Sequence, residues 1–281
     1  MTTLKIAGVP EHFNLPWHLC LEEGKFSNAG IDMQWTDVPE GTGKLCQMLR
    51  DGSADIAVIL TEGIIKDIAA GNESKIVQVY VESPLIWGIH VSARSGYESL
   101  EDIRRGKIAI SRYGSGSHLM AIVNARQQGW ETENLQFEIV NTLDGAVEAL
   151  ANNKADYFMW ERFMTKPIVD AGIFRRIGDC PTPWPCFVIA VRNEALEKHN
   201  EKIGMLLDII NQMTHRFKQI QGIDSVLSAR YGQKAEDIRE WLTLTEWSQK
   251  KLDKNTFETV QDQLSELNII EKKAAFETVA G

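Results

Sequence analysis

The segment Tyr113-Gly114-Ser115-Gly116-Ser117 has the composition of a loop that binds anionic or strongly polar groups. It lies between an apolar strand expected at Lys107–Arg112 and a helix expected at His118–Gln128. Glycine lets the backbone approach a ligand closely, and a helix N-terminus presents free N–H groups and a positive dipole end. The alternative is a flexible turn in which Ser117 caps the helix. The segment is not a dinucleotide fingerprint, because that motif needs glycine where Leu119 stands.

A second glycine-containing segment, Pro39-Glu40-Gly41-Thr42-Gly43-Lys44, also precedes an expected helix. It is not a phosphate-binding P-loop, because Val38 replaces its first glycine and Leu45 its Ser or Thr. It remains open whether Gly41 and Thr42 form a second backbone-amide cradle or a plain turn.

Several titratable side chains follow expected strands. His12 lies in the segment Glu11-His12-Phe13-Asn14, where it could donate to a ligand or act as a base, and a solvated loop histidine is the competing interpretation. His12 and His18 lack an acidic or cysteine partner at ligand spacing, so no zinc site is expected.

Glu62, in the segment Thr61–Gly63, and Glu161 each end an expected strand. Two facing carboxylates would suit acid–base chemistry, although binding a ligand amine or hydroxyl is simpler. A surface ion pair of Glu161 with Arg162 is a third reading. No G-x-S-x-G or H-E-x-x-H motif is present, and Cys186 is expected to be a buried structural thiol.

The eight tryptophans divide by position. Four fall at expected strand ends or crossings and suggest a flat or aromatic ligand, although core packing is the usual fate of a tryptophan. These four are Trp17, Trp87, Trp160 and Trp184. The other four are expected to pack, and they are Trp35, Trp130, Trp241 and Trp247.

The elements that position these residues alternate between strands and helices. Strands are expected at Leu4–Val9, Ile31–Val38, Ala54–Leu60 and Lys75–Val81, with a helix after each of the first three. The first of these helices is expected to run through Leu15–Phe26. This order predicts an α/β fold with a mainly parallel sheet, whose ligand loops lie beyond the carboxyl ends of the strands.

The same order recurs about 100 residues later, with expected strands at Lys107–Arg112, Gln136–Asn141, Ala155–Trp160 and Phe174–Ile177. The repeat predicts two similar lobes with a central cleft. One more strand is expected at Phe187–Arg192. Lobe 1 is residues 1–90 plus 188–281, including helices expected within Leu196–Ile220, Ala235–Leu242 and Thr256–Leu267, and lobe 2 is residues 91–187. Connections near Glu82–Ala93 and Cys180–Val188 would form a hinge that permits closure.

Composition narrows the class of protein. The 281 residues are 43% hydrophobic and 25% charged, which is ordinary for a globular chain. A net charge of −9 disfavours a broad nucleic-acid footprint. No signal peptide or membrane-spanning run is visible, and the four cysteines have no C-x-x-C spacing, so a cytoplasmic protein with reduced thiols is expected.

Four segments resemble the type 2 periplasmic-binding-protein superfamily. They are Val9–Phe26, Gly30-Ile31-Asp32-Met33, Leu49 to Ala57 and Leu100 to Ala109. The resemblance is strongest to the branch that holds sulfonate, taurine and nitrate binding proteins and the fungal thiamine-pyrimidine (hydroxymethylpyrimidine phosphate) synthases, including a cytosolic fungal subgroup. It covers nearly the whole chain and implies two α/β lobes that close on a small ligand.

The synthase members use a lysine that carries pyridoxal phosphate, a nearby histidine and a cysteine-rich cluster. By this resemblance the lysine position falls at Ile59 and the histidine position at Gly63, while Lys66 lies on the following helix. Of the cysteine cluster, only Cys186 has a counterpart. The resemblance therefore implies a retained binding fold without that catalytic set, and no cofactor is expected.

The leading hypothesis is a binding protein for a small polar or anionic ligand, with thiamine-related pyrimidines and sulfonate-like anions as candidates. An enzyme of thiamine-pyrimidine biosynthesis and a ligand-sensing regulatory protein are the alternatives. Neither nucleic acid nor membrane insertion is expected, and no metal site is predicted. The candidate ligand-binding residues are Glu11, His12, Phe13, Asn14, Trp17, Gly41, Thr42, Thr61, Glu62, Trp87, Tyr113, Gly114, Ser115, Gly116, Ser117, Trp160, Glu161 and Trp184.

Overall fold

The computed structural model describes residues 3–281 and divides into two compact units. Unit 1 comprises residues 3–84 and 184–281, and unit 2 comprises residues 85–183. The chain thus leaves unit 1 after Pro84 and returns at Trp184, whereas the sequence pattern placed these boundaries after residues 90 and 187.

Unit 1 is built on a five-stranded sheet with the order β2-β1-β3-β10-β4. Its strands are β1 (Thr3–Gly8), β2 (Asp32–Asp37), β3 (Ile56–Leu60), β4 (Ser74–Val81) and β10 (Phe187–Arg192). β1 pairs in parallel with β2 and β3, whereas β10 is antiparallel to both β3 and β4.

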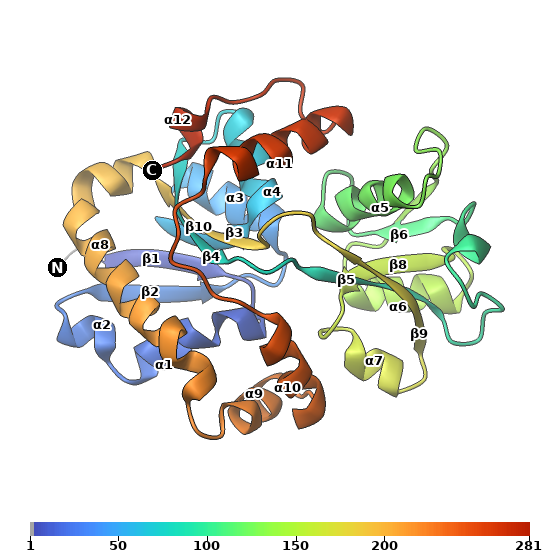
Figure 1. Ribbon diagram of the computed structural model, residues 1–281, viewed down its shortest axis with the longest axis horizontal. Coiled ribbons are helices and arrows are strands. Elements are labelled where there is room, and N and C mark those ends of the chain that lie inside the picture. The colour runs from blue at the N-terminus through green and yellow to red at the C-terminus, as the bar shows by residue number, and fades with distance from the viewer. Residues whose placement is uncertain (1–2) are drawn as a thin grey trace. The chain divides into compact units, whose positions relative to one another are not determined.

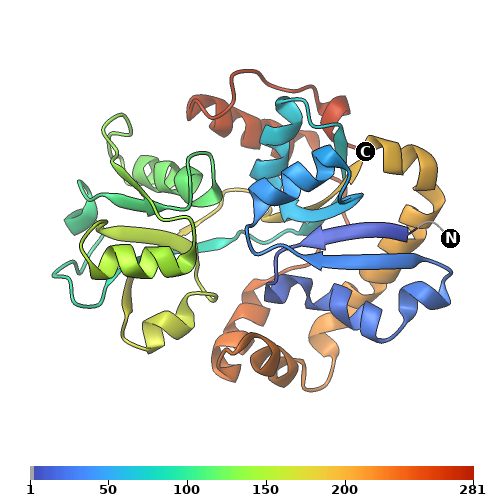
Figure 2. The same cartoon turned by 180° about the vertical axis from the view of Figure 1, so that it is seen from behind.

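Helices cover both faces of the unit 1 sheet (Figures 1 and 2). One face carries α1 (Leu15–Glu22), α2 (Lys25–Asn28) and the long α8 (Asn193–Arg216), and the other carries α3 (Thr42–Asp51) and α4 (Thr61–Ala69). The remaining helical segments are η1 (His12–Asn14), η3 (Phe217–Gln219), α9 (Ile223–Tyr231), α10 (Ala235–Leu244), α11 (Lys254–Glu266) and α12 (Phe276–Val279).

Unit 2 repeats this plan with the strand order β7-β6-β8-β5-β9. Its strands are β5 (Ile86–Ser92), β6 (Ile108–Ile110), β7 (Phe137–Ile139), β8 (Tyr157–Glu161) and β9 (Phe174–Pro181). α5 (Gly116–Gln127) lies on one face, and α6 (Leu143–Ala151) and α7 (Lys166–Asp170) lie on the other (Figure 1); η2 (Glu101–Ile103) precedes β6. β5 is antiparallel to β8 and β9, while β6 is parallel to β7 and β8.

The α/β class and the two similar lobes are confirmed, with one refinement. Each sheet is mixed, because one strand runs opposite to the other four. In each unit this reversed strand, β10 or β5, is the one by which the chain enters from the other unit. A strand that enters a sheet directly from the other unit, with no crossover helix before it, need not run parallel to its neighbours. The strands of a βαβ connection do run parallel.

Other differences have local causes. The helix expected at Leu15–Phe26 divides into α1 and α2, because Gly24 between them has φ +65°, a left-handed conformation. The Glu82–Ala93 stretch, expected to be a connection, contains the central strand β5. The expected loop Thr61–Gly63 is the first turn of α4, and α9 and α12 are helices that the sequence pattern did not predict.

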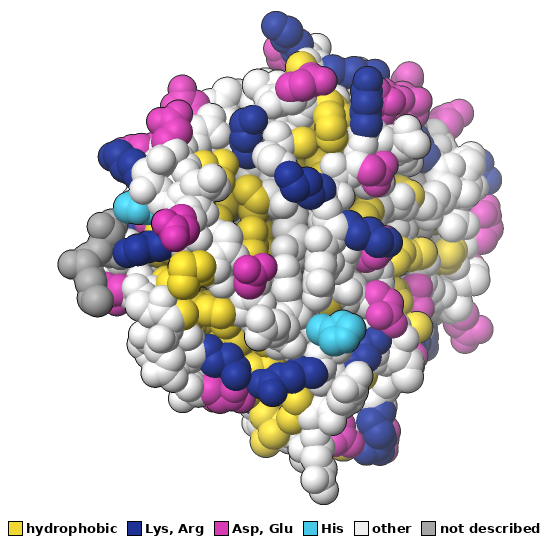
Figure 3. All heavy atoms as spheres, turned by 60° about the vertical axis from the view of Figure 1, so that its left-hand side comes forward, with side chains coloured by type: hydrophobic (Ala, Val, Ile, Leu, Met, Phe, Trp, Pro, Cys, Tyr) yellow, Lys and Arg dark blue, Asp and Glu magenta, His cyan; other side chains and the backbone are white. Residues whose placement is uncertain are grey.

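Among residues 3–281, no helix is both long enough and apolar enough to cross a membrane. On the face drawn in Figure 3, acidic and basic side chains are interspersed and do not gather into a patch of one sign.

Candidate functional site

The carboxyl edge of the unit 1 sheet gathers three chain segments that are distant in sequence. β1 and β3 are neighbours and end there, leading into η1 and α4, while the antiparallel β10 begins there. Thr61 ties two of the segments together, since its N–H donates to Cys186 O at 3.1 Å and its Oγ to Pro185 O at 2.6 Å. Phe13 contacts Phe187, with ring centroids 5.1 Å apart.

His12 is fully buried at this edge and stacks on Trp241 of α10, with ring centroids 4.2 Å apart and 10° between the planes. Tyr231 lies 6.0 Å from the histidine by the same measure. Neither His12 Nδ1 nor Nε2 has a hydrogen-bond partner, and burial lowers the pKa of the imidazole to about 3. The ring is therefore neutral at physiological pH and carries one donor and one acceptor.

The residues beside His12 are held by different contacts. Phe13 O accepts from the hydroxyl of Tyr80 at 2.9 Å and from Trp247 Nε1 at 3.4 Å. Asn14 Nδ2 donates to Val9 O at 2.8 Å, while its buried Oδ1 has no partner. Burial raises the pKa of the Glu11 carboxyl to about 7.

Glu62 occupies the first turn of α4 and is 2% exposed. Trp184 Nε1 donates to Glu62 Oε2 at 2.8 Å, whereas Glu62 Oε1 is buried without a partner. Burial raises the pKa of this carboxyl to about 7, against the opposing effect of hydrogen bonds from its own backbone and from Trp184. Glu62 and Trp184, two candidate residues separated by 122 positions in the chain, are thus joined by a direct hydrogen bond.

The Gly41–Thr42 segment lies against the same helix turn. Gly41 has φ +74° and precedes α3, and Thr42 is the first residue of that helix. A Cβ on Gly63 would lie 2.2 Å from Thr42 Cγ2, so the first turns of α3 and α4 pack with no space for a side chain.

Trp17 is placed differently from the other candidates. It is fully buried in α1, where its ring stacks on Phe26 and Trp35 at 6.2 and 5.7 Å. The structure therefore places this tryptophan in the core of unit 1 and not at a strand end.

In unit 2, the segment 113–117 joins β6 to α5 as expected. Ser115 caps the helix, with Oγ accepting from His118 N at 3.4 Å, in place of the expected cap Ser117. Ser117 Oγ instead accepts from Ser111 N at 2.9 Å and lies 3.1 Å from Ser115 Oγ. The serine hydroxyls thus shape the loop itself, while Tyr113 is 62% exposed.

Three further candidates meet where β8 ends and β5 begins. Trp87 and Glu161 are register partners across these strands, and the rings of Trp87 and Trp160 lie 6.3 Å apart. Glu161 is buried, and its Oε2 accepts from Met164 N at 2.6 Å. Arg162 Nη1 lies 3.5 Å from Asp179 Oδ2. Trp87 Nε1 is buried without a partner.

Sequence reasoning missed the aromatic residues that surround His12. Tyr231, Trp241 and Phe187 contribute rings to this group, but Trp241 was assigned to packing and α9 was not predicted. No local signal connects a histidine at position 12 with a helix more than 200 residues later, so only the tertiary fold shows the contact.

Residues 3–281 contain no group of three or more His, Cys, Asp or Glu side chains that could hold a metal ion. All four cysteines are buried and none forms a disulfide, and Cys186 is buried as expected. Burial raises the pKa of the Cys20 and Cys180 thiols to about 12, so they are poor nucleophiles.

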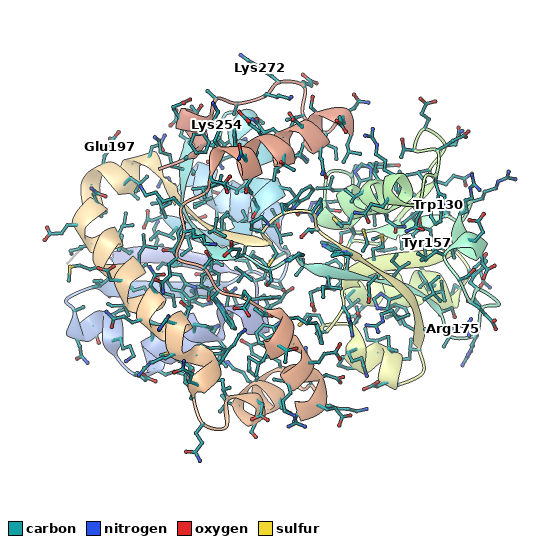
Figure 4. All side chains as sticks on the ribbon, viewed as in Figure 1. Trp130, Tyr157, Arg175, Glu197, Lys254 and Lys272 are labelled. Atoms are coloured by element: carbon teal, nitrogen blue, oxygen red, sulfur yellow. The ribbon has the colours of Figure 1, made fainter. Side chains whose placement is uncertain are left out.

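Two cavities are lined by none of the candidate ligand-binding residues. One, of about 340 Å³, is lined by α11 and the C-terminal segment, including Lys254 (labelled in Figure 4) and Phe276. The other, of about 330 Å³, lies in unit 2 and is lined by Arg162, Lys166 and residues of β9 such as Arg175, also labelled in Figure 4.

Comparison with known proteins identifies the fold. Residues 87–180 match the family described as Ca3427-like PBP. The product of the Candida albicans gene CA3427, described as having the generic periplasmic binding protein fold, superposes with a TM-score of 0.89. It is 28% identical, and the alignment covers 99% of this chain and 93% of that chain. The chain has the type 2 periplasmic-binding-protein fold.

Other proteins with this binding-protein fold are more distant in sequence. The alkanesulfonate-binding protein SsuA from Xanthomonas axonopodis pv. citri, solved bound to MOPS, has a TM-score of 0.83 and 16% identity, covering 99% of this chain and 98% of that one. The nitrate-binding protein NrtA from Synechocystis has a TM-score of 0.74 and 16% identity, covering 99% and 84%. No curated protein matches the sequence significantly.

Proposed function

We propose that the chain is a small-molecule binding protein whose ligand contacts the strand-end residues of unit 1. The observation that carries the proposal is a set of buried polar atoms without protein partners at the carboxyl edge of the unit 1 sheet, namely both nitrogens of His12 and Oε1 of Glu62. Such atoms are costly to bury unpaired and are rare except where a ligand or water completes them. The carboxyl edge is also where ligands bind in open α/β sheets.

The finer proposal is a small polar ligand with a flat ring, of which a thiamine-related pyrimidine is one example. Support comes from the aromatic side chains at the unit 1 edge and from the Tyr113–Ser117 loop of unit 2, whose helix N-terminus favours a negatively charged or strongly polar group. A sulfonate-like anion is the other ligand class, supported by the likeness to the SsuA protein solved with MOPS.

A thermal-denaturation panel tests the proposal. Pyrimidines, thiamine, sulfonates and phosphates are added separately, and a ligand at 100 times its dissociation constant stabilises the folded state by about 2.7 kcal/mol. His12→Ala should abolish that stabilisation, and the exposed His215→Ala should retain it, because only His12 lies at the candidate edge. A panel in which no compound raises the unfolding temperature contradicts the proposal.

Two other functions give different results. An enzyme of thiamine-pyrimidine biosynthesis that uses a lysine-bound pyridoxal phosphate would show Schiff-base absorbance on addition of that cofactor. A ligand-sensing regulator would retain a protein partner only in the presence of the ligand. The sequence gives little support to the first alternative, the pyridoxal-phosphate enzyme. Ile59 and Gly63 stand at the positions where the resemblance implies the lysine and the histidine.

A further inference from the structure

Glu62 is a carboxyl group with one oxygen engaged and the other unsatisfied. Oε2 accepts the 2.8 Å hydrogen bond from Trp184, while Oε1 is buried without a partner on a side chain that is 2% exposed. Burial and two hydrogen bonds account for the shifted pKa of this carboxyl group, and no charged neighbour within residues 3–281 contributes to it. Above pH 7, where Glu62 is mostly ionised, its carboxylate oxygens can only accept, so the missing partner of Oε1 is a donor.

The orientation of the carboxyl group is fixed by its surroundings. Glu62 lies in the first turn of α4, and the preceding Thr61 is anchored to Pro185 and Cys186 by two hydrogen bonds. Trp184, which precedes that same segment, holds Oε2. Glu62 and Trp184 therefore belong to one hydrogen-bonded corner, and a rotation that satisfied Oε1 from the protein would sacrifice one of these contacts.

We propose that Glu62 Oε1 accepts a hydrogen bond from an N–H group of the ligand, so that the ligand is an amine, an amidine or an N–H-bearing heterocycle. This inference rests on the proposed function and narrows its ligand class. In the ligand-free protein a water molecule would serve as the donor, and the ligand replaces it.

The same group disfavours simple anions. A sulfonate, nitrate or phosphate dianion offers acceptors only, so its approach would leave Oε1 unpaired and would place two negative charges together in a desolvated site. A site built to hydrogen-bond a donor rejects an analogue without it far more strongly than an apolar pocket rejects a missing methylene. An anion is compatible with the site only where the same molecule also carries an N–H group.

Matched pairs of compounds test this inference by calorimetric titration of the full chain at pH 8. Taurine is compared with ethanesulfonate, and 4-aminopyrimidine with pyrimidine, because each pair differs by one amino group. The amino compound of a pair is expected to bind at least tenfold more tightly, corresponding to the cost of leaving a buried acceptor unpaired.

Glu62→Gln supplies the sharper comparison. The glutamine oxygen can still accept from Trp184, whereas its NH₂ group replaces the acceptor at Oε1, so shape and the Trp184 contact are retained. In Glu62→Gln, the ratio of the affinity for the amino compound to the affinity for its partner should fall at least tenfold. The variant's preference should thus shift toward the compound without the amino group. Glu194→Gln is the control, since Glu194 is an exposed carboxylate paired with Lys198 on α8, and it should leave both affinities unchanged.

Each outcome is informative. Binding of both members of a pair with equal affinity, or an unchanged preference in Glu62→Gln, overturns the inference while the proposed binding function stands. Binding of neither member of either pair overturns the inference, and the thermal panel then decides the proposed function separately. A Glu62→Gln protein with wild-type near-UV circular dichroism ensures that lost affinity is not lost folding.

Discussion

At the scale of single residues, burial at the unit 1 edge shifts the pKa values of polar groups toward favouring their uncharged forms. Burial lowers the pKa of His12 to about 3 and raises the pKa values of Glu11 and Glu62 to about 7. A neutral imidazole and carboxyl groups poised near neutrality can exchange hydrogen bonds with a ligand at little electrostatic cost. These groups also make folding stability depend on pH in opposite directions.

Glu62 gives a prediction with a defined sign. Its pKa is about 7 in the folded chain and 4.5 in an exposed one, so the folded state binds its proton more tightly. That contribution to stability is fully present below about pH 4.5 and is lost as the pH rises through 7. Relative to wild type, Glu62→Gln should therefore gain up to about 3 kcal/mol of unfolding free energy between pH 5 and pH 8.

Urea unfolding at pH 5, 6, 7 and 8 measures this gain. Glu194→Gln is the control, because its lowered pKa leaves that carboxyl ionised across the whole range, and its difference from wild type should stay constant. A difference between Glu62→Gln and wild type that is equally constant would mean that Glu62 is not protonated in the folded chain near neutral pH.

At the scale of elements, the close packing of two helix starts positions Glu62. Because a Cβ on Gly63 would lie 2.2 Å from Thr42 Cγ2, Gly63→Ala must displace the Thr42 side chain or one of the two helix starts. Overpacking of this kind costs about 1–3 kcal/mol of unfolding free energy. Gly204→Ala is the matched control, since nothing lies within 4 Å of its Cβ position inside α8, and alanine should stabilise that helix by about 0.5–1 kcal/mol.

Denaturant unfolding of Gly63→Ala and Gly204→Ala measures both changes in unfolding free energy. The expected order of stability is Gly204→Ala above wild type above Gly63→Ala, with ligand affinity reduced only in Gly63→Ala. A Gly63→Ala protein as stable as wild type would show that the two helix starts can separate without cost, and the geometry assigned to Glu62 would lose its support.

The elements also show how far sequence reasoning reaches. Apolar runs bounded by turn residues located nine of the ten strands, including β3 and β8, whose ends carry Glu62 and Glu161. β5 was missed because it was read as a connection between lobes. The Thr61–Gly63 turn was read as a loop, since the sequence does not show that α4 begins directly where β3 ends.

Candidate residues followed from their places after strands, whereas their partners did not. The Glu62–Trp184 hydrogen bond and the His12–Trp241 stack join positions separated by 122 and 229 residues, and no spacing rule relates them. Trp17 is the opposite case. Its place near an expected strand end suggested a ligand contact, whereas the structure buries it between Phe26 and Trp35.

At the scale of the whole molecule, the two units repeat one plan. Each has a five-stranded mixed sheet in which the entering strand is reversed. In each, some candidate residues follow the carboxyl end of a parallel strand, as Glu62 does after β3 and the Tyr113–Ser117 loop does after β6. Anion affinity in such a plan comes from helix N-termini and local donors, which is consistent with a net charge of −9. In open α/β sheets ligands bind beyond the carboxyl ends of the strands, so the proposed ligand binding should occur at these strand ends.

Hydrogen exchange read by mass spectrometry tests that property most directly, with taurine and 4-aminopyrimidine added at saturating concentration. The account predicts slower exchange in peptides that cover residues 11–17 and 61–65 of unit 1 and residues 113–118 of unit 2. Peptides from the cavity beside α11, residues 254–277, should exchange as in the free protein. Protection in that cavity alone, or no protection anywhere, would contradict the assignment of the strand ends as the ligand site.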